Sequence, residues 1–269
     1  MACGNGNLTK ASGFAARQSR ARPQHPGDSG QVSQHKEQAA GQGSGRDRPG
    51  GIRAHNERTT MLRMEPAMDM TFTPEDRKRI EDEIGRKYRK VALSPEGSFR
   101  YPTGRAGLEG QNYDPEIIEA LPEDVLASYC GVGNPFSLGR IRKGERILDI
   151  GCGAGVDAIV AGVMTGPAGA VVGLDLTPEM LERARRNLSR TSLKNVSFVE
   201  GSAENLPFPE ASFDVVISNG AFNLVPDKLQ ALREVIRVLK PNGRFMMADQ
   251  VLTTEPPSDA KSMVETWAG

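Results

Sequence analysis

Cysteine is scarce in this chain of 269 residues, and the three cysteines stand far apart. Cys3, Cys130 and Cys152 form neither a C-x-x-C pair nor a Cys/His spacing. This pattern argues against a disulfide framework and against a zinc site. We therefore expect free thiols and no bound metal.

Long apolar runs are missing as well. No stretch approaches the roughly 18 consecutive apolar residues of a membrane span, and the N-terminus has no apolar segment behind a basic start. The composition, 38% hydrophobic and 25% charged, is that of an ordinary soluble protein. The sequence therefore predicts a cytoplasmic chain with one sizeable domain and an extension, and no membrane partner.

The chain also has no net charge, but its basic and acidic residues are unevenly distributed. The first 60 residues hold nine Lys/Arg against four Asp/Glu, and the remainder holds 25 against 30. The mildly acidic remainder disfavours a nucleic-acid partner. Residues 1–60 have too few aliphatic side chains to offset the entropy of ordering, so they are predicted to be a disordered basic tail. The alternatives are an RNA-binding tail, an organelle transit peptide, or a translation start at Met61, Met64, Met68 or Met70.

Residues 61–143 are predicted to be a helical N-terminal extension. Thr73 is a candidate N-cap, with Pro74 at the first helical position and Asp76 in capping-box register. Asp114 and Pro115 give a second start signal before the helical pattern "EIIEALPEDVLASY". The Gly-rich stretch between them, "GSFRYPTGRAGLEGQNY", is predicted to be an irregular loop.

In residues 144–269, short apolar runs alternate with helical patterns. The runs are "RILDIG", "AVVGLDL", "VSFVEG", "FDVVISN" and "GRFMMADQVL". Apolar strands separated by helices are typical of a parallel sheet that is covered on both faces. The sequence therefore predicts an α/β fold with a doubly wound parallel sheet.

The loop after the first of these strands, "DIGCGAG", holds three glycines at alternate positions behind an acid. Gly151, Gly153 and Gly155 permit unusual dihedrals and let a ligand approach the backbone, and in such folds this loop borders the ligand site. A dinucleotide fingerprint would need glycine where Val156 stands. Asp149 at the mouth of the loop favours a ligand with a cationic end over a pyrophosphate.

Two further strands end at the same rim. Asp175 closes the second strand, where an acid can accept hydrogen bonds from both hydroxyls of a ribose. Ala203 and Glu204 follow the third strand in "EGSAENLPFP". The ends of three consecutive strands therefore all indicate the same ligand site.

Four motifs, "ILDIGCGAG", "VVGLDLTPEMLERAR", "EGSAENLPFPEASFDVVISN" and "REVIRVLKPNGRFMMAD", together resemble the class I S-adenosylmethionine-dependent methyltransferases, over about residues 129–252. The resemblance implies a Rossmann-like fold and S-adenosyl-L-methionine as the cofactor. It implies that the glycine loop and Asp149 face the methionine moiety, that Asp175 holds the ribose, and that Leu176 and Ala203 flank the adenine. The predicted cofactor-binding set is completed by Asn219, near the methionine end, and by Glu204 and Tyr129.

The methyl acceptor is predicted to be a small molecule. Families that methylate nucleobase amino groups or glutamine amides resemble one another in an Asn/Asp-Pro-Pro-aromatic loop after the fourth strand, whereas this chain reads "SNGAFNLVPDK". Asn219, Asn223 and Tyr129 are candidates to line the acceptor side. No catalytic residue is assigned, because alignment of nucleophile and sulfonium in a dry site can supply most of the acceleration.

Within the class, "YCGVGNPFSLGRIRKGERILDIGCGAGVDA" and "VVISNGAFNLVPDK" are similar to the arsenite methyltransferase-like subgroup. That resemblance implies thiolate ligands for a soft metalloid, but Val132 and Gly220 stand at two of the three expected cysteine positions. The third would follow "ETWAG", where the chain stops. Cys130 is shifted by two positions from the first and, like Cys152, is interpreted as a small packing residue.

Two other interpretations fit the same residues. "AENLPFPEASFDVV" is equally typical of quinone-type C-methyltransferases, and the missing thiols suit a cofactor-binding, catalytically inactive regulatory protein. The resemblance also implies seven strands, of which five fit before Gly269. We therefore expect a C-terminally truncated domain that lacks the final strand hairpin. We also expect the chain to be a monomer.

Overall fold

The computed structural model describes residues 73–251. All of the described residues belong to one compact unit. The predicted basic tail of residues 1–60 lies outside the described residues. Residues 252–269 also lie outside the described residues, and with them the part of the chain on which the prediction of a missing final strand hairpin depends.

The first described helix, α1 (Pro74–Val91), begins as the sequence predicts. The Thr73 hydroxyl accepts a hydrogen bond from the backbone N–H of Asp76 (3.1 Å), and the Asp76 carboxylate accepts one from the backbone N–H of Thr73 (3.2 Å). This reciprocal pair is the predicted capping box. Val91 and Met180 pack together, and they bring the end of α1 onto α6 (Pro178–Ser189).

Two predictions for the rest of the extension are wrong in part. The Gly-rich stretch is not irregular throughout, because it contains α2 (Gly104–Gly110), whose Leu108 is fully buried. The second predicted helix is interrupted, so that α3 (Pro115–Ala120) and α4 (Glu123–Leu126) are separate. Pro122 explains the break, because a proline forces the residue before it out of the helical region; Leu121 has φ −95° and ψ 144°.

The sheet has five strands within the described residues, and each overlaps one of the five predicted strands. They are β1 (Arg146–Ile150), β2 (Ala170–Asp175), β3 (Val196–Glu200), β4 (Phe213–Asn219) and β5 (Leu239–Ala248). All pairs are parallel, and the strand order is β3-β2-β1-β4-β5. The chain order therefore reverses at β1, and the predicted doubly wound sheet is confirmed.

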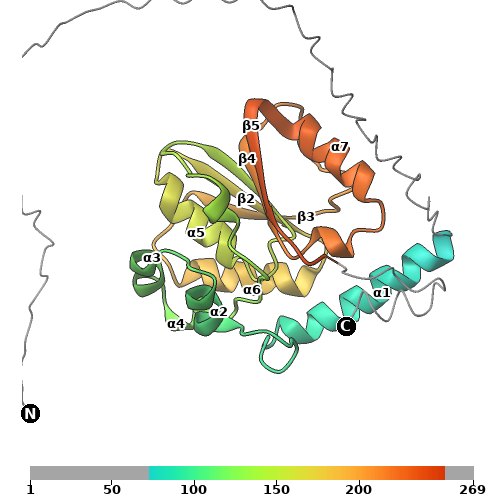
Figure 1. The fold of residues 1–269 in the computed structure, drawn as a ribbon, viewed down its shortest axis with the longest axis horizontal. Coiled ribbons are helices and arrows are strands. Elements are labelled where there is room, and N and C mark those ends of the chain that lie inside the picture. The colour runs from blue at the N-terminus through green and yellow to red at the C-terminus, as the bar shows by residue number, and fades with distance from the viewer. Residues whose placement is uncertain (1–72, 252–269) are drawn as a thin grey trace, which may run out of the picture. The chain divides into compact units, whose positions relative to one another are not determined.

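Helices cover both faces of the sheet. α5 (Val156–Thr165) and α7 (Lys228–Val238) lie on opposite sides of it (Figure 1). Ile147 packs in the cluster that contains Ala158 of α5, whereas its neighbour Leu148 packs in the cluster that contains Val235 of α7. Successive side chains of a strand point to opposite faces, so both faces of β1 are apolar and buried.

The start of β5 differs from the prediction, which placed the strand at "GRFMMADQVL". β5 begins at Leu239, which pairs with Phe213, but the register then shifts so that Arg244 pairs with Val215. The residues between them bulge from the sheet, and Asn242 adopts a left-handed conformation (φ +65°). The "KPNG" turn signal is therefore a bulge within the strand rather than a loop before it.

The extension shares its core with the sheet domain. Leu108 and Tyr113 of the extension belong to the same buried cluster as Val156 and Ile159 of α5. The short helix η1 (Pro135–Leu138) also contacts β5 and β4. None of the helices in residues 73–251 combines the length and apolar character that crossing a membrane requires.

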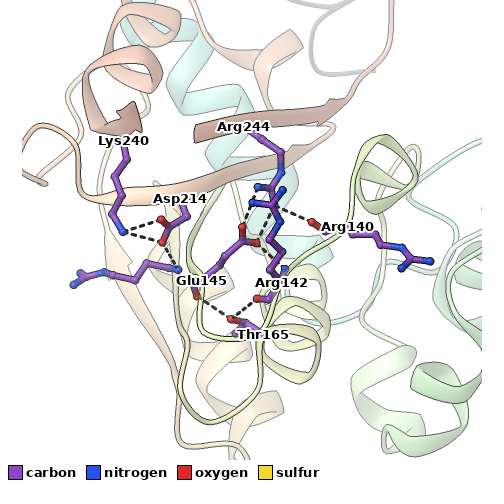
Figure 2. A network of polar contacts seen from close by, with 8 residues as sticks. Arg140, Arg142, Glu145, Thr165, Asp214, Lys240 and Arg244 are labelled. Atoms are coloured by element: carbon purple, nitrogen blue, oxygen red, sulfur yellow. Dashed lines mark hydrogen bonds and ion pairs between the residues drawn. The ribbon is translucent and has the colours of Figure 1, made fainter. Parts of the chain in front are cut away.

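A polar cluster joins three strands at the amino end of the sheet (Figure 2). The Arg244 guanidinium on β5 donates two hydrogen bonds to the carboxylate of Glu145, just before β1 (2.9 and 2.8 Å). Lys240 contacts both carboxylate oxygens of Asp214 on β4 (2.8 and 2.9 Å). The Thr165 hydroxyl donates to the Glu145 carbonyl (2.8 Å) and ties in the end of α5.

We predict that Glu145→Gln destabilises the fold by about 1.5–3 kcal/mol at pH 7, because it weakens a largely buried, two-pronged ion pair. Partial burial raises the pKa of Glu145, but hydrogen bonds from Arg244 and from the Arg142 N–H outweigh it and leave the pKa below its ordinary value. A depressed folded-state pKa gives stability that is present above the ordinary pKa and is lost as the pH falls through the folded value.

Urea unfolding at pH 7 and near pH 3 measures this effect, with the exposed Glu182→Gln as the matched control. The difference between Glu145→Gln and the unmodified chain should shrink at the lower pH, and the control should differ little at either. An equal difference at both pH values would show that the ion pair is not its source.

Candidate functional site

A pocket opens at the carboxyl ends of the strands, around β1, where the chain order reverses. Its walls come from the loops that follow β1, β2, β3 and β4, from the segment before β1, and from α1. This is the position predicted for a ligand in a doubly wound sheet. Every predicted cofactor-binding residue lines the pocket except Gly155.

The three glycines of the loop have different surroundings. All have positive φ (70°, 51° and 79°), which favours glycine. A Cβ at Gly151 would lie 2.2 Å from the Cβ of Ala221, so the loop after β4 lies directly against this position. A Cβ at Gly155 would lie 2.6 Å from the ring of Phe198. Gly151 and Gly153 therefore border the pocket, whereas Gly155 allows close packing at the start of α5.

Asp175 is held in place by backbone donors. Its carboxylate accepts hydrogen bonds from the N–H groups of Gly153 and Thr177, both at 2.8 Å. Burial raises the pKa of Asp175, and these hydrogen bonds oppose the rise. The carboxylate at the end of β2 thus fixes the glycine loop while it lines the pocket.

Asp149 is the least compensated acid in the pocket. It is only 2% exposed, and its Oδ2 atom has no hydrogen-bond partner among the described residues. Burial raises the pKa of Asp149 well above its ordinary value, and the negative charges of Asp157 and Asp175 raise it further. An unpaired buried carboxylate oxygen is costly, so a cationic group placed beside it would be strongly favoured.

Asn219 is fully engaged in hydrogen bonds within the protein. Its Oδ1 atom accepts from the N–H groups of Val132 (2.8 Å) and Gly133 (3.1 Å). Its Nδ2 atom donates to the Gly133 carbonyl (2.7 Å) and to the Asp157 carboxylate (3.0 Å). The side chain at the end of β4 therefore fastens the segment before β1 to the sheet, although it also lines the pocket.

Tyr129 belongs to the same network. Its hydroxyl donates to the Gly133 carbonyl (2.9 Å), and Tyr113 donates to the Asp157 carboxylate (2.7 Å). Burial raises the pKa of Asp157 to about 6, against the lowering effect of the hydrogen bonds from Tyr113 and Asn219. Asp157 and Tyr113 were not predicted from the sequence; the one available signal was an acid in the first turn of the apolar helix "VDAIVAG".

The remaining predicted residues lie toward β3 and β4. Glu204 lines the pocket, and its carboxylate accepts hydrogen bonds from Arg77 of α1 (3.2 Å) and from the Asp227 N–H (2.6 Å). Leu176 is 51% exposed and, with Ala203, gives the pocket an apolar surface. Asn223, a predicted acceptor-side residue, does not line the pocket.

The two positions where the resemblance implies cysteine lie against each other. A Cβ at Gly220 would lie 3.2 Å from a methyl carbon of Val132. Neither position carries a thiol, and the nearby Cys130 lines the pocket from within an apolar cluster. Burial, followed by the charges of Asp157 and Asp175, raises the pKa of Cys130 to about 12. Its sulfur is therefore a neutral thiol at neutral pH.

Comparisons with known proteins agree with this geometry. Residues 141–268 match the family described as methyltransferase domain. An arsenite methyltransferase of Halobacterium salinarum is 36% identical over 167 residues, which cover 62% of this chain and 42% of the relative. A demethylmenaquinone methyltransferase of Listeria monocytogenes is 40% identical over 121 residues, which cover 45% of this chain and 50% of the relative. The chain thus spans half or less of the length of these relatives.

A solved structure gives a similar match. An arsenic(III) S-adenosylmethionine methyltransferase from Chlamydomonas reinhardtii is 35% identical over 58% of this chain and 52% of the other, with a TM-score of 0.45. Residues 141–268 of the chain thus match a methyltransferase domain. The chain is similar to the arsenite methyltransferases.

We predict that Asn219→Ala destabilises the protein by about 1–3 kcal/mol, because it removes the acceptor of the Val132 and Gly133 N–H groups and a donor to the buried Asp157 carboxylate. Chemical denaturation measures the change, and Asn205→Ala, an exposed asparagine after β3, is the matched control. A loss no larger than that of the control would contradict the role assigned to the Asn219 amide.

Proposed function

We propose that the chain binds S-adenosyl-L-methionine in this pocket and transfers its methyl group to a small molecule. The observation that carries the proposal is the charge of the lining. Among the described residues that line the pocket there is no Lys, Arg or His, but there are five carboxylates: Glu81, Asp149, Asp157, Asp175 and Glu204. S-adenosylmethionine carries a sulfonium and an ammonium, whereas dinucleotides and nucleoside triphosphates carry phosphates that this lining would repel.

The residues present fit this cofactor. Asp149 offers a carboxylate oxygen that no described residue satisfies, which suits the ammonium of an amino acid. Asp175 lies at the end of β2, where its carboxylate can accept hydrogen bonds from the hydroxyls of a ribose. Gly151 and Gly153 have no side chains, so the ligand can approach the backbone of the loop closely. When bound, the cofactor supplies an electrophilic methyl group, and the protein aligns the acceptor with it and excludes water.

The acceptor is proposed to be a small molecule that protein thiolates do not hold. Arsenite needs soft ligands, and the two converging positions carry Val132 and Gly220 instead. Cys130 is a neutral thiol. Within residues 73–251 no group of three or more His, Cys, Asp or Glu side chains could hold a metal ion.

A quinol-type carbon acceptor is the second candidate. The loop after β4 contributes Ala221, Leu224, Val225 and Pro226 to the pocket, and Ile84 of α1 also lines it. Such an apolar wall suits an aromatic ring better than a hydrated oxyanion. A relative named as a demethylmenaquinone methyltransferase supports the same choice. Cofactor binding without turnover on any acceptor would instead favour a regulatory protein.

We predict that Asp175→Ala weakens S-adenosylmethionine binding by roughly 1.5–3 kcal/mol, the range for hydrogen bonds to a charged group. Isothermal titration calorimetry measures the change. Glu200→Ala is the matched control, because Glu200 pairs with Asp175 in register on β3 but is exposed and does not line the pocket. Equal affinities for the two variants would remove Asp175 from the site.

We predict that the chain methylates arsenite far more slowly than about 1 per second, a slow rate for an enzyme. Mass spectrometry of methylated arsenic species measures this rate, with and without glutathione, which can supply thiolates of its own. A quinol precursor assayed in parallel tests the second candidate. Arsenite turnover at or above that rate without glutathione would contradict the thiol argument, and its loss in Cys130→Ser would make Cys130 an arsenic ligand.

A further inference from the structure

An acid-lined pocket raises a problem for one part of the proposed cofactor. S-adenosylmethionine carries a carboxylate at its amino-acid end, and no Lys, Arg or His is among the described residues that line the pocket. The carboxylate therefore needs neutral hydrogen-bond donors. This inference rests on the proposed function, because it concerns how the same ligand is held.

The glycine loop does not supply these donors as it stands. The N–H groups of Gly151 and Cys152 both donate to the Leu174 carbonyl (2.8 and 3.0 Å). The N–H of Gly153 donates to Asp175, and that of Gly155 to the Cys152 carbonyl (both 2.8 Å). Four backbone donors of the loop are thus already used inside the protein.

One tyrosine in the pocket remains uncommitted. Of the four tyrosines in the chain, all within the described part, Tyr101, Tyr113 and Tyr129 donate hydrogen bonds to protein oxygens. Tyr88 lines the pocket from α1, and the described residues include no hydrogen-bond partner for its hydroxyl. Its ring is half-buried against the cluster that contains Met180.

Tyr88 lines the pocket, and ionisable groups from several pocket walls lie around it. The hydroxyl is within electrostatic reach of Cys130 before β1, of Asp175 at the end of β2 and of Asp249 after β5. Burial and these neighbours raise the pKa of Tyr88, so the hydroxyl keeps its proton and remains a donor at neutral pH. Ile84, one turn earlier, lines the same pocket, so this face of α1 is a wall of the site.

We propose that Tyr88 binds the carboxylate at the amino-acid end of the cofactor, and that α1 is thereby part of the cofactor site. Ser202 is another lining hydroxyl, but it lies after β3, separated from β1 by β2. The Ser202 hydroxyl accepts a hydrogen bond from the Glu204 N–H (3.2 Å), which holds it toward the β3 side of the pocket. Tyr88 belongs to the extension rather than to the strand ends where the sequence predicts the site.

Two ligands that differ only in the amino-acid part test the proposal. S-adenosylhomocysteine has the carboxylate, and 5′-methylthioadenosine lacks the amino-acid end. Tyr88→Phe keeps the ring and removes the donor. We expect it to raise the Kd of S-adenosylhomocysteine by about tenfold or more and to leave that of methylthioadenosine unchanged, as measured by calorimetry on the full chain.

Ser202→Ala is the matched control, and it should leave the ratio of the two Kd values unchanged. A melting curve establishes that Tyr88→Phe is folded at the titration temperature. Unchanged affinity for S-adenosylhomocysteine, or equal weakening of both ligands, would overturn the role of Tyr88 and leave the proposed function intact. Failure of the unmodified chain to bind S-adenosylhomocysteine would overturn both.

Discussion

The site depends on buried negative charge at the carboxyl end of the sheet. Asp149, Asp157 and Asp175 come from β1, α5 and β2. The negative charges of Asp157 and Asp175 raise the pKa of Asp149, so it is costly to keep all three carboxylates ionised together. The protein compensates two of them with hydrogen bonds, from Tyr113 to Asp157 and from backbone N–H groups to Asp175. One oxygen of Asp149 has no hydrogen-bond partner among the described residues. A cationic ligand beside Asp149 would offset the cost of burying this unpaired carboxylate oxygen. The uncompensated charge of Asp149 and the proposed preference for a cationic cofactor therefore have the same cause.

The extension is part of the site rather than an appendage to it. Its hydrophobic residues share one core with α5, and its polar residues fasten the segment before β1 through Asn219 and Gly133. α1 covers the pocket with Ile84 and Tyr88, and Arg77 ties the start of the helix to Glu204. Such contacts couple the order of the extension to the geometry of the pocket. Loosening α1 would therefore alter ligand affinity as well as stability.

The sequence predicts the sheet and the glycine loop because these are local patterns. Apolar runs of strand length, the capping box at Thr73 and the acid before Gly151 each depend on neighbours within a few residues, and the structure has all three. The break at Pro122 was also readable, but the helical spacing on either side obscured it. The bulge in β5 depends on pairing with β4, which no local pattern reveals.

The hydrogen-bond network was beyond prediction for a different reason. Asn219 and Gly133 lie 86 residues apart, and Asn219 and Asp157 lie 62 apart. Their contacts exist only once β1, β4 and α5 are assembled. The sequence places Asn219 at this strand end near the ligand, and the residue does line the pocket, but the contacts of its amide with Gly133 and Asp157 were not predicted. No sequence motif marks Tyr88, and only the folded pocket shows that its hydroxyl has no hydrogen-bond partner among the described residues.

We propose above all that the carboxylate-lined pocket selects a cationic nucleoside. Calorimetric titration of the unmodified chain at neutral pH, with S-adenosylmethionine in one experiment and NAD in the other, tests it most directly. The charge of the lining predicts saturable binding of S-adenosylmethionine and no measurable binding of NAD. Binding of NAD with equal or higher affinity, or no binding of S-adenosylmethionine, would contradict it.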